Sequence, residues 1–205
     1  MNKKISIINY GMGNTGSIRN MISYLGCECE VTDDKEIIDN SDFIILPGVG
    51  KFDAAVKNLK DRNLFDVLIK KAQSINSRIL GICLGMQIMC LKSEEGNMEG
   101  LGIFNAEVKS FSENISEFLK VPHMGWNFLE RNKKSKYLNN LKNPRFYFVH
   151  SFYVQSYDES EVIFKTEYGL QFVSALENHN NIGVQFHPEK SHKYGKEFFR
   201  NFLDL

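Results

Sequence analysis

A cysteine flanked by glycines, where an apolar run gives way to a helical pattern, constrains this sequence more than any other feature. The apolar run is Arg78–Leu80, the turn is Gly81–Gly85, and the apolar-periodic run is Met86–Met89. Such a G-x-C-x-G turn is the thiol form of a nucleophile elbow, because glycine tolerates strained backbone angles and leaves room beside the nucleophile. The positive end of the following helix favours a thiolate. The sequence therefore predicts that Cys83 is a nucleophile; the alternative is a buried cysteine that only packs.

A second apolar run, Ile182–Phe186, leads directly into His187, Pro188 and Glu189. A cysteine nucleophile needs a general base, and the base needs a group that orients it. His187 can be the base and Glu189 can hold its far ring nitrogen, while Pro188 keeps the backbone between them extended and rigid. Because Cys83 also follows a strand, both side chains are expected at one edge of a parallel sheet. The alternative is a histidine at a strand end beside a surface glutamate.

A third segment can supply hydrogen-bond donors for an oxyanion. The apolar run Phe43–Leu46 is followed by the glycine-bracketed turn Pro47–Gly50. Acyl transfer through a thioester passes a tetrahedral oxyanion, which backbone N–H groups stabilise. We expect donors from this turn and from the N–H of Leu84, although Pro-Gly-x-Gly by itself is only a turn signal.

Strand and helix patterns alternate in the first half of the chain, which predicts a parallel sheet covered on both faces. The expected strands there are Ile5–Asn9, Cys27–Val31, Phe43–Leu46 and Arg78–Ile82. The expected helices are Asn14–Leu25, Phe52–Asn58 and Leu64–Gln73. The second half predicts antiparallel additions and a closing helix at Lys193–Phe202. Its expected strands are Ala106–Phe111, Trp126–Leu129, Phe146–Val149, Val162–Lys165, Phe172–Ala175 and Ile182–Gln185.

Composition excludes some function classes. The 205 residues suit a single domain, 1–205, and 25 basic residues balance 25 acidic ones, so nothing marks a nucleic-acid or anionic-membrane binder. No apolar run approaches the roughly 20 residues of a membrane span, and Ile5–Ile8 is too short for a signal-peptide core, so we expect a cytoplasmic protein. Cys27, Cys29 and Cys90 are interpreted as packing residues, with Cys27-x-Cys29 in a strand, and no metal site is expected.

The segment Gly11–Gly16 formally matches the G-x-G-x-x-G dinucleotide fingerprint after a first strand. The acidic residue expected about 20 positions later would be Asp33 or Asp34, after the strand rather than at its end. NAD binding is therefore an alternative that the sequence disfavours, and no cofactor is expected.

Six motifs in the same order resemble class I, triad-type glutamine amidotransferases. More narrowly, they resemble the glutaminase subunits of imidazole glycerol phosphate synthases, from Ile5 to about Phe202. The motifs are Asn9–Asn14, Pro47–Gly50, Gly81–Gln87, Pro122–Asn127, Tyr147–Ser151 and Phe186–Ser191. The resemblance implies a flavodoxin-like three-layer α/β/α fold. It also implies hydrolysis of glutamine to glutamate and ammonia through a thioester on Cys83.

The resemblance further assigns residues that hold glutamine or its oxyanion: Val49, Gly50, Leu84, Gln87, Glu95, Ser151 and Phe152. A carboxylate such as Glu95 suits the substrate ammonium, and amide or backbone donors suit the substrate carboxylate. The alternative for Glu95 is a surface acid in a loop.

The resemblance also implies a heterodimer, in which ammonia passes to a (β/α)₈ cyclase subunit of the histidine pathway. The residues expected to face that partner are Asn9, Met12, Asn14, His123, Trp126 and Asn127. The single tryptophan suits an interface anchor, and the alternative is a core aromatic. Two other functions stay open: a paralogue that supplies ammonia to a related synthase, such as one forming an amidine on a surface sugar, and an inactive scaffold.

Overall fold

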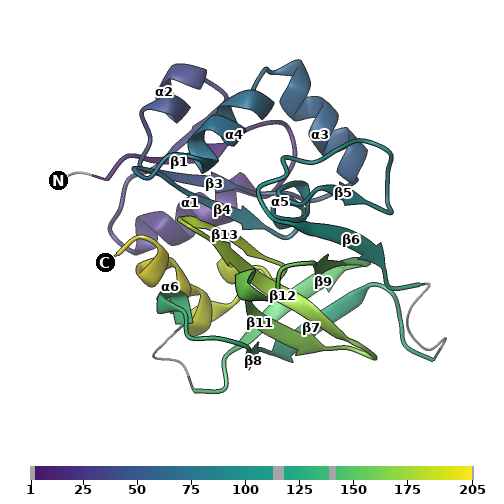
Figure 1. Cartoon of the computed structure of the whole chain (residues 1–205). Coiled ribbons are helices and arrows are strands. Elements are labelled where there is room, and N and C mark those ends of the chain that lie inside the picture. The colour runs from purple at the N-terminus through teal and green to yellow at the C-terminus, as the bar shows by residue number, and fades with distance from the viewer. Residues whose placement is uncertain (1–2, 113–117, 139–141, 205) are drawn as a thin grey trace.

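The computed structural model describes residues 3–112, 118–138 and 142–204 (Figure 1). The elements of the first half are β1 Ile5–Ile8, α1 Thr15–Tyr24, β2 Glu30–Thr32, α2 Lys35–Asp39, β3 Phe43–Leu46, α3 Phe52–Asp61, α4 Phe65–Ala72, β4 Arg78–Ile82 and α5 Leu84–Ile88. The strands that follow are β5 Lys92–Ser93, β6 Ala106–Ser110, β7 His123–Phe128, β8 Glu130–Arg131, β9 Arg145–His150, β10 Phe152–Ser156, β11 Val162–Glu167, β12 Gln171–Asn178 and β13 Asn181–Val184. The chain closes with α6 His192–Phe202, and short 3₁₀ turns lie at Lys136–Leu138, Glu159–Glu161 and Pro188–Lys190.

The main sheet has the strand order β2-β1-β3-β4-β13-β12-β10-β6-β5. The strands from β2 to β13 run parallel to one another, whereas β12 is antiparallel to β13 and β10, and β10 is antiparallel to β6. This confirms the expected mostly parallel sheet with antiparallel additions in the C-terminal half. Ile82 at the end of β4 pairs with Val184 at the end of β13, so segments far apart in sequence finish side by side.

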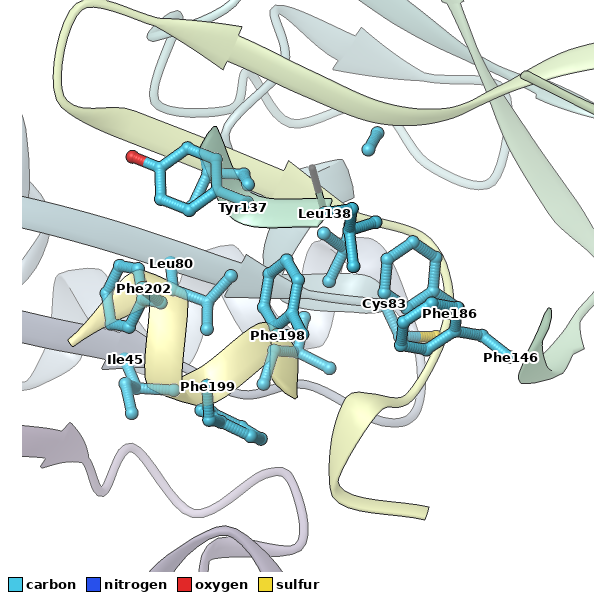
Figure 2. Packing of buried hydrophobic residues seen from close by; sticks show 14 of the residues in the cluster. Ile45, Leu80, Cys83, Tyr137, Leu138, Phe146, Phe186, Phe198, Phe199 and Phe202 are labelled. Carbon is cyan, nitrogen blue, oxygen red and sulfur yellow. The ribbon is translucent and has the colours of Figure 1, made fainter. Parts of the chain in front are cut away.

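Helices cover both faces of the sheet, and each face has its own apolar core, which gives the three-layer α/β/α arrangement (Figure 1). On one face lie α1 and α6. Figure 2 shows Phe198, Phe199 and Phe202 of α6 beside Ile45 and Leu80 of the sheet. Burying each of these rings stabilises the fold by about 1.5–3 kcal/mol. The opposite face is covered by α2, α3, α4 and α5.

Strands β7 and β9 form a separate antiparallel pair, with Trp126 opposite Tyr147. Because side chains alternate along a strand, one face of β7 presents Met124, Trp126 and Phe128, which are 62, 44 and 56% exposed. An isolated bridge between Tyr147 and His187 connects β9 to the chain beyond β13. The pair therefore places an apolar surface next to the end of the parallel strands.

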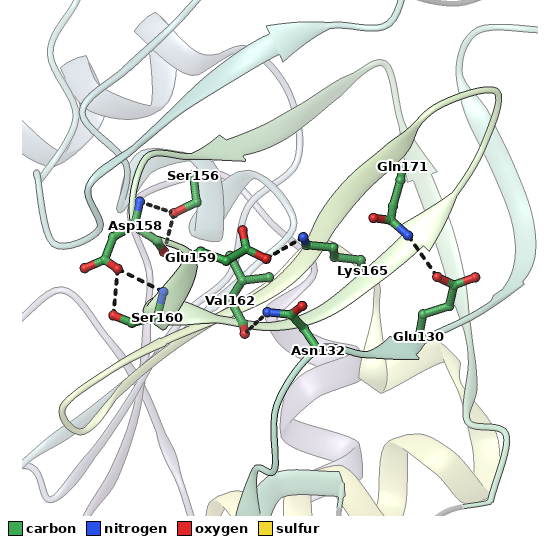
Figure 3. Close-up of polar contacts among 9 residues, drawn as sticks. All are labelled: Glu130, Asn132, Ser156, Asp158, Glu159, Ser160, Val162, Lys165 and Gln171. Carbon is green, nitrogen blue, oxygen red and sulfur yellow. Dashed lines mark hydrogen bonds and ion pairs between the residues drawn. The ribbon is translucent and has the colours of Figure 1, made fainter.

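Polar contacts hold the outer strands β8, β11 and β12 together (Figure 3). The Gln171 amide donates to the Glu130 carboxylate at 2.9 Å, and the Asn132 amide donates to the Val162 carbonyl at 3.0 Å. Asp158 accepts the backbone N–H of Ser160 and so begins the 3₁₀ turn before β11.

Two expectations about local structure were wrong. The strand expected at Cys27–Val31 begins only at Glu30, where β1 provides pairing partners, so both cysteines precede it and lie half-buried. The short elements α2, β5, β8 and β10 were not expected, because two to five residues show too little periodicity to detect.

Within the described part of the chain, no helix is long and apolar enough to cross a membrane. The described residues also contain no group of three His, Cys, Asp or Glu side chains arranged to hold a metal ion.

Candidate active site

Cys83 lies at the tight turn between β4 and α5, where its φ of 55° is in the left-handed region. Its backbone N–H donates to the Val184 carbonyl at 2.8 Å, which ties the turn to β13. A Cβ on Gly85 would stand 1.9 Å from the Leu46 carbonyl oxygen, and one on Gly81 would stand 2.8 Å from the Gly85 carbonyl oxygen. The two glycines are therefore required for close backbone packing as well as for the turn.

His187 follows β13 and is buried next to the turn that carries Cys83. Its backbone N–H donates to the Tyr147 carbonyl at 2.8 Å, and its Nδ1 lies 2.7 Å from the Glu189 carboxylate. Burial alone lowers the pKa of His187, but the Cys83 sulfur and the Glu189 carboxylate outweigh it and raise the pKa to about 10. The buried Nε2 has no hydrogen-bond partner among the described residues. The His187 Nδ1 is thus anchored by Glu189, and its Nε2 is left without a hydrogen bond to the described residues.

A cavity of about 340 Å³ opens beside Cys83 and His187, a volume that suits a small-molecule ligand. Its lining includes every residue expected to hold glutamine: Val49, Gly50, Leu84, Gln87, Glu95, Ser151 and Phe152. Pro122, Val149 and His150 also line it, and the sequence interpretation missed them. A larger cavity of about 770 Å³ lies at the other end of the strands, near Lys4 and Glu30. That cavity contains no paired nucleophile and base, so its size does not make it the site.

Two polar side chains of the cavity are already held by the protein. The Gln87 amide Nε2 donates to the Phe152 carbonyl at 3.1 Å. One Glu95 carboxylate oxygen accepts the backbone N–H of Phe52 at 2.9 Å, at the start of α3. Glu95 therefore stabilises a helix N-terminus while it lines the cavity, and both contacts fix the orientation of the two side chains.

The turn Pro47–Gly50 lies against the start of α5 and under the segment that follows β1. A Cβ on Gly48 would stand 2.7 Å from the Gly85 nitrogen, and one on Gly50, whose φ is 113°, would stand 2.7 Å from the Met12 Cε. The Tyr10 hydroxyl donates to the Pro47 carbonyl at 2.7 Å. The Pro47–Gly50 turn thus contacts the Tyr10–Met12 segment on one side and the turn that carries Cys83 on the other.

Residues expected to face a partner divide into surface and interior positions. Asn9 and Asn14 are exposed and Met12 is half-buried, while the Asn14 side chain also accepts the Ser17 N–H to begin α1. The prediction that His123 faces a partner was wrong, because the side chain is buried. It points to the opposite face of β7 from Trp126 and is buried, with its Nδ1 2.9 Å from the His150 Nε2.

Trp126 and Asn127 keep contact with solvent. The Trp126 ring is stacked on His192 at 5.7 Å between centroids, and the half-buried Asn127 amide donates to the Glu167 carbonyl at 2.9 Å. The expectation that Trp126 is not a core aromatic agrees with its 44% exposure.

Sequence interpretation also missed Gln185, whose amide Nε2 donates to the Cys83 sulfur at 3.6 Å. The available signal was a glutamine within an otherwise apolar run.

Comparisons with known proteins identify the family of this chain. A family model described as "Glutamine amidotransferase class-I" matches residues 6–205. The chain is 48% identical to imidazole glycerol phosphate synthase subunit HisH 2 of Methanococcus maripaludis, over 97% of this chain and 98% of that protein. It is 39% identical to subunit HisH 2 of Pseudomonas aeruginosa, over 98% and 99%.

Solved structures share the fold at lower sequence identity. A crystal structure of a glutamine amidotransferase superposes with a TM-score of 0.76 at 17% identity, covering 97% of both chains. A likeness at this identity supports the arrangement of strands and helices alone, and the family follows from the sequence matches. This chain belongs to the class I glutamine amidotransferase family.

Proposed function

We propose that the chain is the glutaminase subunit of an imidazole glycerol phosphate synthase, and that it hydrolyses glutamine to glutamate and ammonia. One structural observation carries the proposed chemistry. Cys83 and His187 lie just beyond the ends of neighbouring parallel strands and line a common cavity of about 340 Å³, and the His187 Nδ1 lies 2.7 Å from the Glu189 carboxylate. The relatives named as subunits of this synthase support the assignment of the pathway.

In the proposed reaction, His187 takes the proton of the Cys83 thiol, and the sulfur attacks the carboxamide carbon of glutamine. Glu189 keeps His187 in the required tautomer and stabilises its positive charge. Backbone N–H groups of Val49, Gly50 and Leu84 stabilise the oxyanion. His187 then returns the proton to the departing nitrogen and ammonia leaves.

The second half of the reaction restores the protein. The intermediate is a glutamyl thioester on Cys83, and His187 takes a proton from the water that attacks it. The carbon–sulfur bond breaks, glutamate leaves, and the thiol forms again. Gln87, Glu95, Ser151 and Phe152 would hold the amino-acid end of the substrate, in agreement with the resemblance, because all of them line the same cavity.

We further propose that ammonia passes to a (β/α)₈ cyclase subunit in a heterodimer. The partner surface is the apolar face of β7, formed by Met124, Trp126 and Phe128, together with the exposed part of Asn9–Asn14. Aromatic and methionine side chains are enriched at protein interfaces. We place this reaction in the cytoplasm, because four free cysteines suit a reducing compartment.

Replacing the nucleophile tests the proposed function. Cys83→Ala, in complex with the cyclase, is expected to lose glutamine-dependent synthesis and to keep synthesis from ammonium salt, because the sulfur acts only in releasing ammonia. The assay compares both nitrogen donors for the wild type and the variant. Equal loss with both donors would show that Cys83 is structural. Wild-type activity with another acceptor and none with the cyclase would instead favour a paralogous pathway.

A further inference from the structure

Gln185 is fully buried at the end of the β13 run and contacts the nucleophile directly. Its backbone N–H pairs with the Ser174 carbonyl of β12 at 3.0 Å, which fixes where the side chain begins. Its amide Nε2 lies 3.6 Å from the Cys83 sulfur, and its Oε1 lies 3.1 Å from the Gln87 Nε2. Neither the turn motif nor the His-Pro-Glu motif includes this residue.

Neighbouring groups determine which end of the Gln185 amide faces the sulfur. The Phe152 carbonyl can only accept, so the Gln87 side chain must present its NH₂ group to it. The second N–H of that group then points to Gln185 and requires an acceptor, which is Oε1. If the Gln185 amide were reversed, two NH₂ groups would face each other. The Gln185 NH₂ group is therefore directed to Cys83.

The Phe152 carbonyl also contacts His150, which is paired with a second buried histidine, His123. The His150 Nδ1 lies 2.7 Å from the Phe152 carbonyl and must carry the proton, so the His150 Nε2 is an acceptor. The His123 Nδ1, 2.9 Å away, must then donate, and its Nε2 accepts the Asn127 amide at 3.3 Å. Every donor and acceptor direction in this chain of contacts is thus set, from the half-buried Asn127 to the sulfur.

We propose that Gln185 is a further catalytic residue of this site, whose amide donates a hydrogen bond to the Cys83 sulfur and stabilises its thiolate. The chain of contacts through Gln87, the Phe152 carbonyl, His150 and His123 keeps that donor in place. The proposal rests on the proposed function, since it describes the same nucleophile. It adds a hydrogen-bond donor that remains on the sulfur after the thiol proton has moved to His187. The thiolate is then stabilised by two groups, the His187 ring and the Gln185 amide.

Variants of Gln185 test this donor through the reactivity of Cys83. Gln185→Met keeps the side-chain length and removes the donor, and Gln185→Glu replaces it with a carboxylate. The alkylation rate of Cys83 by iodoacetamide is measured against pH in the full chain without glutamine. Losing a hydrogen bond to a charged sulfur is expected to raise the pH midpoint by about one unit in the methionine variant. The glutamate variant is expected to shift further, because its charge repels the thiolate.

Other titratable groups near the sulfur are unchanged in these variants: His187 and Glu189 beyond β13, Tyr10 after β1, Glu95 and His150. Ser174→Ala is the matched control. Ser174 is buried on the adjacent strand, its hydroxyl has no hydrogen-bond partner in the described part of the chain, and its loss is expected to leave the midpoint unchanged. Thermal unfolding shows whether each variant is folded, which matters because an unfolded chain would expose the thiol. If one Gln185 variant does not fold, the other still decides the test.

An unchanged or lowered midpoint in either folded Gln185 variant overturns the proposal, even if the wild type hydrolyses glutamine. A raised midpoint supports it, and it does so even if no glutamine hydrolysis is found, in which case only the proposed function fails. Steady-state rates give a second criterion. A donor to the thiolate predicts a lower kcat with little change in KM, whereas a misplaced Gln87 would mainly raise KM.

Discussion

His187 and Glu189 are joined by a 2.7 Å contact, but the proposed mechanism gives them unequal parts. In that mechanism His187 transfers protons to and from the sulfur, whereas Glu189 acts only through the ring that it orients. We therefore predict that His187→Ala lowers the glutaminase rate as much as Cys83→Ala does, and that Glu189→Gln lowers it less. Effects within such a triad are not additive.

Steady-state glutamate release from the three variants, each with the partner bound, measures this order. A Glu189→Gln variant as inactive as Cys83→Ala would contradict it, and would show that orientation of the ring is as necessary as the ring itself.

Gly85 is a position near the proposed site where a single added methyl group should destabilise the fold. Its Cβ would stand 1.9 Å from the Leu46 carbonyl oxygen, and backbone atoms cannot rotate away as a side chain can. We predict that Gly85→Ala destabilises the fold by at least about 3 kcal/mol, at the upper end for overpacked sites. Gly16→Ala in α1 is the control, because its nearest neighbour is 3.8 Å away. It is expected to stabilise by about 0.4–1 kcal/mol. Urea unfolding of both variants decides the point.

At the scale of elements, the Tyr10–Met12 segment contacts the Pro47–Gly50 turn and so connects the proposed partner surface to the candidate site. We predict that the isolated chain is a poor glutaminase, and that partner and acceptor together raise its rate about 100- to 1000-fold. That factor corresponds to one oxyanion donor, worth about 2.7–4 kcal/mol. Rotation of one peptide plane at Val49 would complete the donor set, and the partner would bias it through Met12.

Glutamate release is measured from the chain alone, with the cyclase, and with the cyclase and an acceptor analogue. Tyr10→Phe, which loses the hydrogen bond to the Pro47 carbonyl, is expected to reduce the activation. A rate that is independent of every addition would exclude this gate and indicate a constitutive glutaminase.

At the scale of the whole molecule, three buried histidines make stability depend on pH in two directions. Burial lowers the pKa of His123 to about 4 and that of His150 to about 3, so the unfolded chain binds their protons first as pH falls. Stability is therefore expected to decrease between about pH 7 and pH 4. His187 acts in the opposite sense. Its pKa is raised to about 10, so its contribution is complete below about pH 6.5 and is lost as pH rises through about 10.

The urea midpoint measured from pH 4 to pH 10 checks both limbs. His187→Gln should lack the part of the alkaline decrease that comes from this residue, while its acid limb should resemble that of the wild type. A wild-type midpoint that does not change with pH would contradict both the lowered pKa values of His123 and His150 and the raised pKa of His187 as causes.

Long and strongly patterned segments could be predicted from the sequence. The bounds of β3 and β4 agree with expectation, because continuous apolar runs between turn residues define buried parallel strands. The cavity brings together residues expected from motifs, since the ends of parallel strands meet at one edge. The roles of those residues, and the single-domain assignment of 1–205, stay predictions.

Other features depend on contacts that no local pattern contains. The burial of His123 follows from the start of β7, three residues before the strand expected at Trp126–Leu129, which puts it on the opposite face from Trp126. The contact of Gln185 with Cys83 depends on the adjacency of β4 and β13. A polar side chain in a buried strand can be recognised from sequence, but its partner cannot.

Trp126 is the only tryptophan in the sequence, and it lies on the surface proposed for the partner. Its ring is stacked on His192 at an interplanar angle of 7°, with the Arg145 guanidinium 5.8 Å from the ring centre. The tryptophan fluorescence of the chain therefore arises at one place. Covering that place would move the emission to shorter wavelength as water leaves the indole. The protein thus carries its own optical reporter of subunit docking, and a titration with a tryptophan-free cyclase would give the dissociation constant without any added label.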